Sequence, residues 1–588
     1  MKNDDRSQTA GRPERRSALF SAAWGRVLGL LLLTFSAVPS YAAPPRKPPS
    51  KFSPDLAPYV GSSSTVAVNV QFKTMPGSPA LKKWQGRGAG IGWRLPTIKA
   101  VTMHVPGTML STLAADGSVV YMTLDRQVSM TANPRTEQFA TAVEADIAAS
   151  QYALDGTGVG VAIIDSGIAA HPDLNDSNGA SRVVYSQSFV AGDTTTPDQY
   201  GHGTHVAGLI GGSGVSSGTA NGYAATYTGM APNVNLINLR VLDQNGNGTD
   251  SQVIAAIQQA IALQSTYNIR VINMSLGRPV FESYTLDPVD QAVEAAWQAG
   301  IVVVVAAGNN GRYRPTNGFA TIGVPANDPA VLTVGATMTL GTPTRADDKL
   351  ASYSSKGPTA IDHIVKPDLV APGNRLVSLR ANGSTLDKGH PQDEVTSTSG
   401  GSAYYVLSGT SMATPVVSGA VALMLQQNPS LTPDQVKARL MKTAWKGFGQ
   451  YTTSYDINTN AYNNEYDLFT YGAGYLDIDA ALGNTDLASG IALSPTAVNN
   501  NGTITITNTT PDSNFNGSSV VWGSTSVVWG TSVVWGANLF TSSSVVWGAT
   551  SVVWGATSES GYSVVWGATS TSETGVAALD TGDDGDDS

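Results

Sequence analysis

The sequence predicts an α/β fold in which a doubly wound parallel sheet carries helices on both faces. Five apolar runs are continuous rather than alternating, which is typical of strands buried on both sides. These runs cover residues 159–165, 235–242, 269–276, 301–308 and 330–337. Helical stretches beginning at Asp250 and covering 288–300 alternate with them, and such alternation favours a parallel sheet between two layers of helices. Thr432, followed by Pro433 and Gln435, predicts a further helix start with a capping box.

Composition excludes several classes of function. The 588 residues contain no cysteine, which rules out disulfides, cysteine-based zinc sites and thiol nucleophiles. The net charge of −10 is concentrated at the acidic C-terminal end, and no basic stretch suggests a nucleic-acid partner.

The N-terminus predicts export by a bacterial-type signal peptide covering residues 1–42. Six Lys or Arg residues precede the apolar run Val27–Val38, and small residues follow near Ala42. A membrane anchor is the alternative, but the run is well short of the roughly 20 residues that a spanning helix needs. We therefore expect a secreted or cell-surface protein.

The remaining chain divides by composition. We expect a Pro-rich linker (43–60), a small α+β domain (61–131), the large α/β domain (140–484), a Ser/Thr/Asn-rich linker (485–517), a repeat region (518–567) and an acidic tail (568–588). In the small domain, 65–72 and 119–128 read as strands and 107–116 reads as a helix.

We expect reactive side chains at the carboxyl ends of the parallel strands, because ligands bind there in such sheets. Asp165 ends the first buried strand, and a buried carboxylate there needs a partner. His202 and His205 open a helix-like stretch and read as a base, a metal pair or structural residues. Ser411 precedes an apolar helix whose Pro415 is expected in the first turn, so Ser411 should lie at a helix N-terminus that favours negative charge.

Three motifs carry a resemblance to a known family. The stretches "AIIDSGI", "GHGTHVAG" and "SGTSMATPVVSG" closely resemble the signature stretches of the subtilisin-like serine peptidases, in the family's order Asp, His, Ser. The stretches "MSLG", "AAGNNG", "SSKGP" and "KPDLVAPG" resemble further family motifs in order. The resemblance covers about 140–484 and implies the subtilisin-like version of the predicted fold and a secreted serine endopeptidase.

The resemblance also implies roles for individual residues. Ser411 would attack the scissile carbonyl, His202 would take and return the proton, and Asp165 would hold the imidazole tautomer. The side-chain amide of Asn309 and the backbone N–H of Ser411 would stabilise the oxyanion. His205 would be a structural neighbour rather than the base.

Further residues are implied as the substrate and metal sites. The substrate cleft would be lined by Ser275, Leu276, Gly277, Ala306, Ala307 and Gly308. Asp173 matches one calcium ligand of the family, although the loop expected to complete that site departs from the pattern. No cofactor is required for the chemistry, and structural Ca²⁺ stays open.

The segment 61–131 resembles, by position and by strand–helix–strand order, the inhibitory propeptide of these enzymes. The resemblance implies a zymogen in which this segment assists folding and blocks the cleft, with self-cleavage between about 128 and 140. The expected partners are protein or peptide substrates and this propeptide.

The pentapeptide "SVVWG" occurs six times between Ser519 and Gly567. The unit favours strands with a glycine break. A disordered tail, a tryptophan array that contacts glycans or the cell surface, and a self-associating segment are all compatible with it. The alternative function is a non-enzymatic surface or binding protein on a peptidase fold, with these repeats as the binding element.

Overall fold

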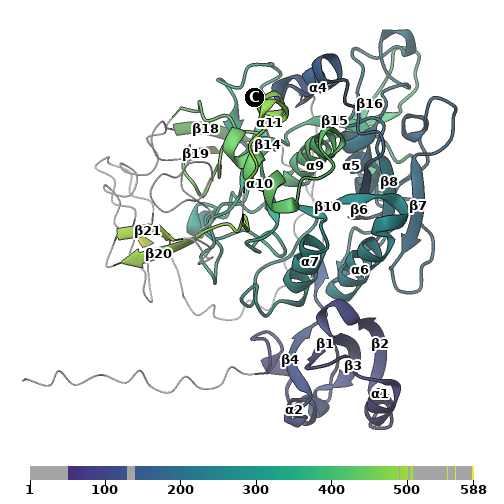
Figure 1. Cartoon of the computed structure of the whole chain (residues 1–588), viewed down its shortest axis with the longest axis vertical. Coiled ribbons are helices and arrows are strands. Elements are labelled where there is room, and N and C mark those ends of the chain that lie inside the picture. Colours follow the sequence, from purple (N-terminus) through teal and green to yellow (C-terminus); the bar gives the residue numbers. More distant parts are fainter. Residues whose placement is uncertain are drawn as a thin grey trace, which may run out of the picture. The chain divides into compact units, whose positions relative to one another are not determined.

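The computed structural model describes residues 51–128, 139–449, 451–488 and 490–500, together with the strands at 503–507, 552–553, 563–564 and 586–587 (Figure 1). The signal peptide, the first residues of the predicted linker, the processing region and most of the repeats and tail lie outside these residues and stay predictions. Among the residues that are described, none of the helices combines the length and the hydropathy needed to cross a membrane.

The main body, residues 139–498, is built on an eight-stranded sheet. Its strands are β6 (Gly160–Asp165), β7 (Val183–Ser188), β8 (Asn235–Arg240), β10 (Ile269–Met274), β11 (Val302–Ala306), β12 (Leu332–Met338), β13 (Lys349–Leu350) and β14 (Leu369–Pro372). Their order is β13-β12-β11-β10-β6-β8-β7, with β14 beside β12, and only the β12–β13 pair is antiparallel. The five predicted apolar runs form the five adjacent central strands, which confirms the parallel sheet.

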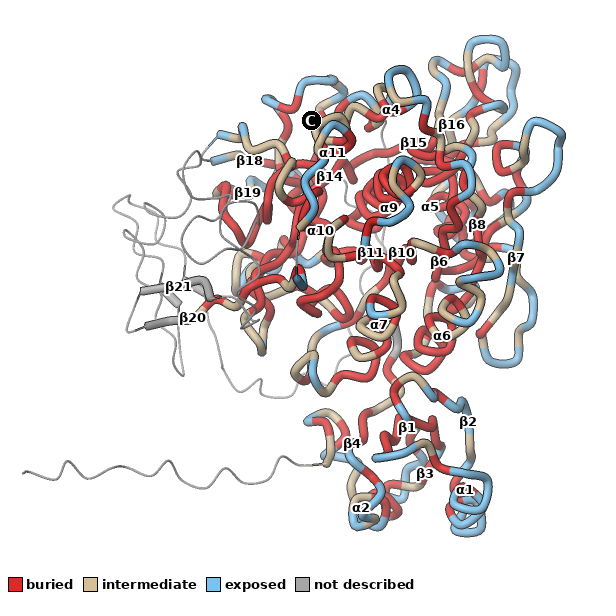
Figure 2. Tube along the Cα trace, in the orientation of Figure 1, coloured by how far each residue is buried: buried red, intermediate tan, exposed pale blue. Residues whose placement is uncertain are grey.

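Helices lie on both faces of this sheet. The helices of the body are α3 (Phe139–Ala142), α4 (Ala145–Tyr152), α5 (His202–Gly211), α6 (Asp250–Tyr267), α7 (Pro288–Gln298), α8 (Thr385–Gly389), α9 (Thr410–Gln427), α10 (Pro433–Thr443) and α11 (Ile478–Gly483). Helices α6 and α7 pack on one face, and α5 and α9 pack on the other (Figure 1). The central strands are buried from both sides (Figure 2), which is why their sequences are continuously apolar.

Local signals place two of these helices. Helix α10 begins with the predicted capping box, in which Thr432 accepts from the backbone N–H of Gln435 and the Gln435 side chain accepts from Thr432. Helix α6 begins at Asp250 as expected, behind a second capping box formed by Thr249 and Gln252. Each box satisfies backbone donors that the first helical turn leaves unpaired.

The remaining strands of the body form smaller sheets. They are β9 (Gly248–Thr249), β15 (Leu376–Leu379), β16 (Glu394–Val395), β17 (Tyr404–Leu407), β18 (Tyr451–Asp456) and β19 (Ala461–Glu465). The hairpin of β20 (Thr496–Asn500) and β21 (Thr503–Thr507) follows, and short pairs involve β22 (Val552–Val553), β23 (Ser563–Val564) and β24 (Asp586–Asp587). β22 and β23 fall within two of the SVVWG repeats.

The N-terminal segment, residues 51–128, is a four-stranded antiparallel sheet with two helices. Its elements are β1 (Thr65–Phe72), α1 (Ser78–Gln85), β2 (Gly90–Leu95), β3 (Ala100–Pro106), α2 (Gly107–Ala115), β4 (Val119–Leu124) and β5 (Gln127–Val128). The sheet order is β2-β3-β1-β4. The expected strands and helix are present as β1, α2, β4 and β5, while α1, β2 and β3 were not expected.

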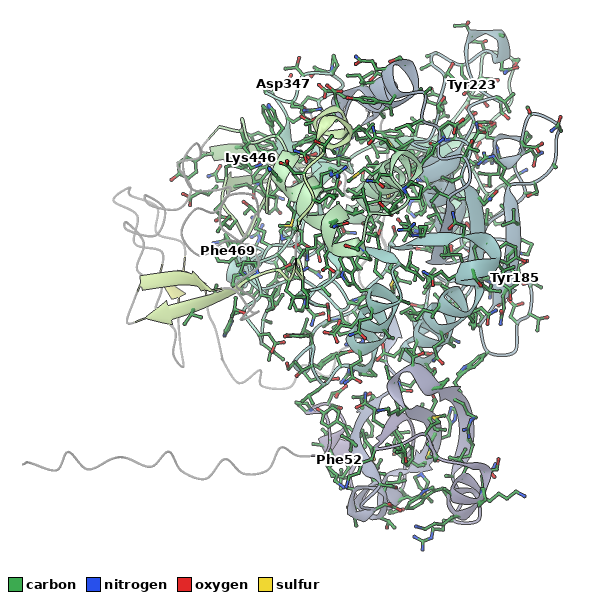
Figure 3. All side chains as sticks on the ribbon, viewed as in Figure 1. Phe52, Tyr185, Tyr223, Asp347, Lys446 and Phe469 are labelled. Atoms are coloured by element: carbon green, nitrogen blue, oxygen red, sulfur yellow. The ribbon has the colours of Figure 1, made fainter. Side chains whose placement is uncertain are left out.

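Two expected linkers are partly folded. Residues 51–60 pack against residues 61–128 and form part of the N-terminal segment. Phe52 lies beside the apolar core of the segment, and Leu56 is fully buried in it (Figure 3). The body also extends past 484, because Ala492 and Ser494 are buried and Val365 donates a hydrogen bond to the Pro495 carbonyl. Composition hid both extensions, since a few buried residues in a polar stretch are enough to fix it.

Candidate active site

The candidate site lies at the carboxyl edge of the central strands. Within the sheet, β8 and β7 lie on one flank of β6, whereas β10, β11 and β12 lie on its other flank. Such a switch in strand order opens a crevice at the carboxyl ends of the strands. Asp165 is the last residue of β6, Ser275 follows β10, and Asn309 follows β11.

Asp165 and His202 form a buried pair. Nδ1 of His202, the first residue of α5, lies 3.0 Å from Oδ1 and 3.1 Å from Oδ2 of Asp165. The two side chains are 0% and 1% exposed. Nδ1–H therefore donates to the carboxylate, and Nε2 carries the lone pair. Nε2 is buried and has no hydrogen-bond partner within the described residues, so the ring is oriented as an acceptor for a proton.

Asp198, a residue that sequence reasoning missed, holds the helix that carries His202. Its carboxylate is buried and accepts hydrogen bonds from the Ser166 hydroxyl, from the backbone N–H of Gly201 and from both the N–H and the hydroxyl of Thr204. These bonds satisfy the first turn of α5. Asp198 lies three residues before Gly201, which occupies the N-cap position of α5, so no ordinary N-cap signal in the sequence marks it.

Gly203 is required by the close approach of α5 to β6. A Cβ atom at this position would lie 2.2 Å from the carbonyl oxygen of Gly167 and 3.0 Å from Oδ1 of Asp165. Any side chain would force α5 away from the strand that carries Asp165. Gly203, the residue after His202, therefore sets the distance between His202 and Asp165.

Ser411 is the second residue of α9, as the predicted helix start required. Its hydroxyl donates to the backbone carbonyl of Ser275 over 3.1 Å, and the Ser275 hydroxyl donates to the Ser411 carbonyl over 2.8 Å. No hydrogen bond joins Ser411 to His202 in this structure, a common state of catalytic hydrogen bonds before substrate binds.

Pro415 lies in the second turn of α9, so its expected place in the first turn is wrong. Proline has no N–H to donate to the carbonyl four residues earlier, which is that of Ser411. The Ser275 hydroxyl takes that carbonyl instead. The helix thus tolerates Pro415 through a bond that also joins α9 to the residue after β10.

Asn309 is fixed by the residue that begins α9. Its carboxamide oxygen accepts hydrogen bonds from the backbone N–H and from the hydroxyl of Thr410, both over 2.9 Å. These two bonds from Thr410 fix the orientation of the Asn309 carboxamide. Its N–H donors therefore point away from Thr410. The backbone N–H groups at the start of α9 lie next to it, where the helix dipole favours negative charge.

His205 is structural, as the resemblance implied. It is fully buried on α5, and its Nε2 lies 3.1 Å from the carbonyl oxygens of both Leu376 and Tyr405. Nε2–H donates to these carbonyls and ties α5 to β15 and β17. Burial, with a smaller contribution from His202, lowers the pKa of His205 to about 3.

We expect His205 to make the fold sensitive to acid. Unfolded histidine binds a proton near its ordinary pKa of about 6.5, whereas His205 in the folded chain stays neutral until about pH 3. Its contribution to stability is therefore complete above pH 6.5 and is lost as the pH falls, with a slope approaching about 1.4 kcal/mol per pH unit. Urea unfolding of Ser411→Ala, with and without His205→Gln, between pH 7 and 4 measures this. Equal slopes in the two proteins would rule the effect out.

The predicted substrate-lining residues are brought to the same edge. Ser275, Leu276 and Gly277 follow β10. Ala306 ends β11, and Ala307 and Gly308 follow it. The Leu276 side chain is buried, so this stretch presents backbone rather than side chains. The backbone N–H of Gly308 donates to the Thr410 hydroxyl, which links this stretch to the start of α9.

The surroundings of Asp173 do not fit the calcium expectation. Its carboxylate oxygens accept from the Ser216 backbone N–H over 2.9 Å and from the Tyr404 hydroxyl over 2.6 Å. The Arg182 guanidinium donates to the Asp173 backbone carbonyl over 2.8 Å. Donors and a cation thus satisfy this buried residue. Within the described ranges, no group of three or more His, Cys, Asp or Glu side chains is arranged to hold a metal ion.

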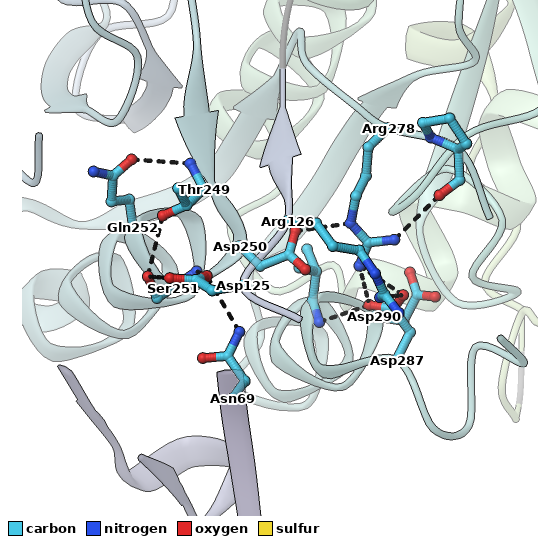
Figure 4. Close-up of polar contacts among 12 residues, drawn as sticks. Asn69, Asp125, Arg126, Thr249, Asp250, Ser251, Gln252, Arg278, Asp287 and Asp290 are labelled. Carbon is cyan, nitrogen blue, oxygen red and sulfur yellow. Dashed lines mark hydrogen bonds and ion pairs between the residues drawn. The ribbon is translucent and has the colours of Figure 1, made fainter. Parts of the chain in front are cut away.

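The N-terminal segment contacts the body at β9 and at the start of α6. β5 pairs antiparallel with β9, with Gln127 opposite Thr249 and Val128 opposite Gly248. The Asp125 carboxylate accepts from the backbone N–H and the hydroxyl of Ser251 in the first turn of α6 (Figure 4).

Comparison with known proteins agrees with the geometry. Residues 156–474 match the Subtilase family. Over 340 residues the chain is 38% identical to the serine protease AprX of Bacillus subtilis (strain 168), covering 57% of this chain and 71% of that protein. Over 327 residues it is 36% identical to subtilisin DY of Bacillus licheniformis, covering 55% of this chain and 91% of that protein.

A solved structure shows the same fold. The crystal structure of fervidolysin from Fervidobacterium pennivorans, described as a keratinolytic enzyme related to subtilisin, superposes with a TM-score of 0.53 at 22% identity. The match covers 76% of this chain and 68% of that one. With the family matched over more than half of the chain, and with these relatives, the protein belongs to the subtilase family and is a subtilisin-like serine endopeptidase.

Proposed function

We propose that this endopeptidase cleaves peptide bonds with a triad of Asp165, His202 and Ser411 and with Asn309 as an oxyanion donor. The observation that carries the proposal is the buried pair of Asp165 and His202, whose second ring nitrogen is left to accept a proton. A serine hydroxyl at a helix N-terminus is the nucleophile that such a base serves.

Each group has one task in the reaction. His202 Nε2 takes the Ser411 proton as Oγ bonds to the scissile carbonyl carbon, and the imidazolium then protonates the leaving amine. Asp165 holds the proton on Nδ1 and stabilises the imidazolium. The Asn309 amide and the Ser411 backbone N–H donate to the carbonyl oxygen as it gains charge. Water repeats the sequence on the acyl-enzyme.

Labelling with phenylmethylsulfonyl fluoride tests these roles directly. The reagent sulfonylates a serine oxygen only where a neighbouring base takes its proton, and fluoride leaves. We expect one label per processed chain, on the peptide that contains Ser411, and none in Ser411→Ala, in His202→Ala or in urea-unfolded protein. A label on a different serine, or equal labelling of His202→Ala, would contradict the triad.

We further propose that the N-terminal segment keeps the enzyme inactive until self-cleavage between about 128 and 140. The pairing of β5 with β9 supports this, because it places extended chain along the body directly before the expected processing region. Bonds from Asp125 to the start of α6 also support it, since they hold the segment by a helix N-terminus.

Deleting residues 43–131 tests the segment's role in folding. We expect little folded, active enzyme from the shortened chain, and recovery when residues 43–131 are supplied as a separate chain. Normal yields of active enzyme without the segment would contradict the proposal.

We also propose that residues 1–42 direct export of the protein. N-terminal sequencing of protein from the growth medium checks this, with a start near residue 43 expected before self-processing.

We propose that the tryptophan repeats contact glycans or the cell surface. Pull-down on cell envelopes of proteins with and without residues 518–567 checks this, and equal retention of both proteins would contradict it.

A further inference from the structure

Arg126, next to β5, is buried in an acidic cluster of the body. Its guanidinium donates to both Glu282 carboxylate oxygens over 2.6 and 2.5 Å and approaches Asp287 at 3.4 Å. The guanidinium also lies 5.0 Å from the Phe281 ring centre, a favourable cation–π distance. Arg126 and Glu282 are 6% and 4% exposed. The body residues Glu282, Asp287 and Phe281, together with Asp55 of the N-terminal segment, therefore bury this side chain almost completely.

The body's own charges do not balance without Arg126. Arg278 is the cation that the body supplies here, and it donates to Asp250 and to both oxygens of Asp287 (Figure 4). Among the described residues, Arg278 thus pairs with Asp250 and Asp287, whereas the cation that pairs with Glu282 is Arg126 of the N-terminal segment. The second carboxylate oxygen of Asp250 is buried with no hydrogen-bond partner within the described residues.

Loss of the N-terminal segment would leave Glu282 with its charge unpaired. The segment supplies Arg126 and also Asp55, whose carboxylate binds the same guanidinium over 2.8 and 3.0 Å. Their departure leaves Glu282 without a cation. A buried charge that loses its partner is strongly destabilising, so the vacated position favours a replacement cation.

Arg126 occupies a defined position in the pairing of β5 with β9. The backbone carbonyl of Arg126 accepts from the Asp250 N–H over 2.8 Å, and the next two residues pair with Thr249 and Gly248. An extended peptide that took the place of β5 along β9 would present one side chain to Glu282. That side chain belongs to the residue immediately before the one opposite Thr249.

We propose that Glu282, with Asp287 and Phe281, forms a substrate subsite that selects arginine or lysine at this upstream position of the peptide. The subsite rests on the proposed function, because it takes the N-terminal segment as occupying the substrate's path. A guanidinium meets both oxygens of Glu282 and the ring of Phe281 together, so arginine is preferred over lysine. An acidic residue at the same position is rejected by like charge.

Peptides derived from the chain's own processing region test the subsite. Five peptides of residues 122–142 carry Arg, Lys, Gln, norleucine or Glu at position 126 and are otherwise identical. The self-processed enzyme is incubated with each, and mass spectrometry locates the cleaved bond. We expect kcat/KM at that bond to be about 10- to 100-fold higher for Arg than for Gln, with Lys between them and Glu lowest.

Variants of the enzyme assign the preference to Glu282. In Glu282→Gln the ratio of kcat/KM between the Arg and Gln peptides should fall to about 3 or less. Glu465→Gln, which makes the same change at β19, should keep the parent ratio. Both peptides are measured with one enzyme sample, so a smaller folded fraction cancels from the ratio.

The outcomes separate the two proposals. Cleavage of all five peptides at similar rates contradicts the subsite and leaves the peptidase proposal intact. An unchanged ratio in Glu282→Gln also contradicts the subsite. Cleavage of none of them, by protein that also fails to take the sulfonyl fluoride label, overturns the proposed function and the subsite with it.

Discussion

Asp165→Asn is expected to lower kcat by about 10⁴-fold, a magnitude taken from serine peptidases with this triad as a class. The Asn amide would donate to His202 Nδ1, so the ring proton would move to Nε2, which could then no longer accept from Ser411. The bond from the Ser166 backbone N–H to Asp165 Oδ1 survives, because Asn keeps one carbonyl oxygen. KM should change little, since no substrate contact is lost. Steady-state kinetics on a chromogenic peptide measures both constants.

A second buried aspartate provides the control. Asp173→Asn also removes a buried charge, at a carboxylate whose partners are Tyr404, Ser216 and, at 3.7 Å, His171 rather than the proposed base His202. It should lower the thermal midpoint but leave kcat within a few-fold of the parent. Similar losses of kcat in both variants would show that Asp165 acts through stability and not through the tautomer of His202.

Asn309→Leu is expected to lower kcat by about 10²- to 10³-fold, the range known for oxyanion-hole donors of serine peptidases as a class. The amide N–H donates more strongly as charge develops on the carbonyl oxygen, so its loss raises the barrier and leaves ground-state binding nearly unchanged. KM should therefore stay close to the parent value. The same peptide kinetics, normalised by sulfonyl fluoride titration, measures the change.

Asn309→Asp separates catalysis from capping. Asn309 also binds the N–H and hydroxyl of Thr410 through its carboxamide oxygen, and leucine loses that contact as well. Aspartate keeps an oxygen for Thr410 but removes the N–H donor and places negative charge beside the oxyanion. Its kcat should fall at least as far as that of Asn309→Leu. Near-parent activity in Asn309→Asp would mean that the residue only caps α9.

The central sheet could be predicted from sequence because strands buried on both faces have continuously apolar sequences. Runs such as 301–308 are apolar at every position, and they are the neighbouring inner strands. The start of α9 could be predicted for a similar local reason, since Gly409, Thr410 and Ser411 precede a long apolar stretch. Motifs in family order supplied the candidate triad.

The parts that could not be predicted depend on contacts between distant residues. The tolerance of Pro415 inside α9 rests on the Ser275 hydroxyl, which lies 136 residues from Ser411. The pairing of Arg126 with Glu282 joins residues 156 positions apart. Neither Ser275 nor Glu282 can be recognised as a partner from its sequence neighbours. Each acquires its role only when the fold brings an unpaired carbonyl or a buried charge beside it.

Strand β2 escaped prediction for a local reason. β2 (Gly90–Leu95) is mostly exposed and contains two glycines, so it carries little apolar alternation. It forms at the edge of its sheet by pairing with β3. Edge strands of this kind depend on a neighbour for their definition more than on their own residues.

The most direct test of the peptidase assignment compares the full-length protein with Ser411→Ala, following intact mass and casein hydrolysis over hours. The assignment predicts that the parent shortens itself between about residues 128 and 140 and then hydrolyses casein, whereas Ser411→Ala does neither. Casein hydrolysis by Ser411→Ala at the parent rate would contradict Ser411 as the nucleophile. A parent that stays intact and inactive, even after a trace of mature subtilisin is added to remove the N-terminal segment, would contradict the assignment as a whole.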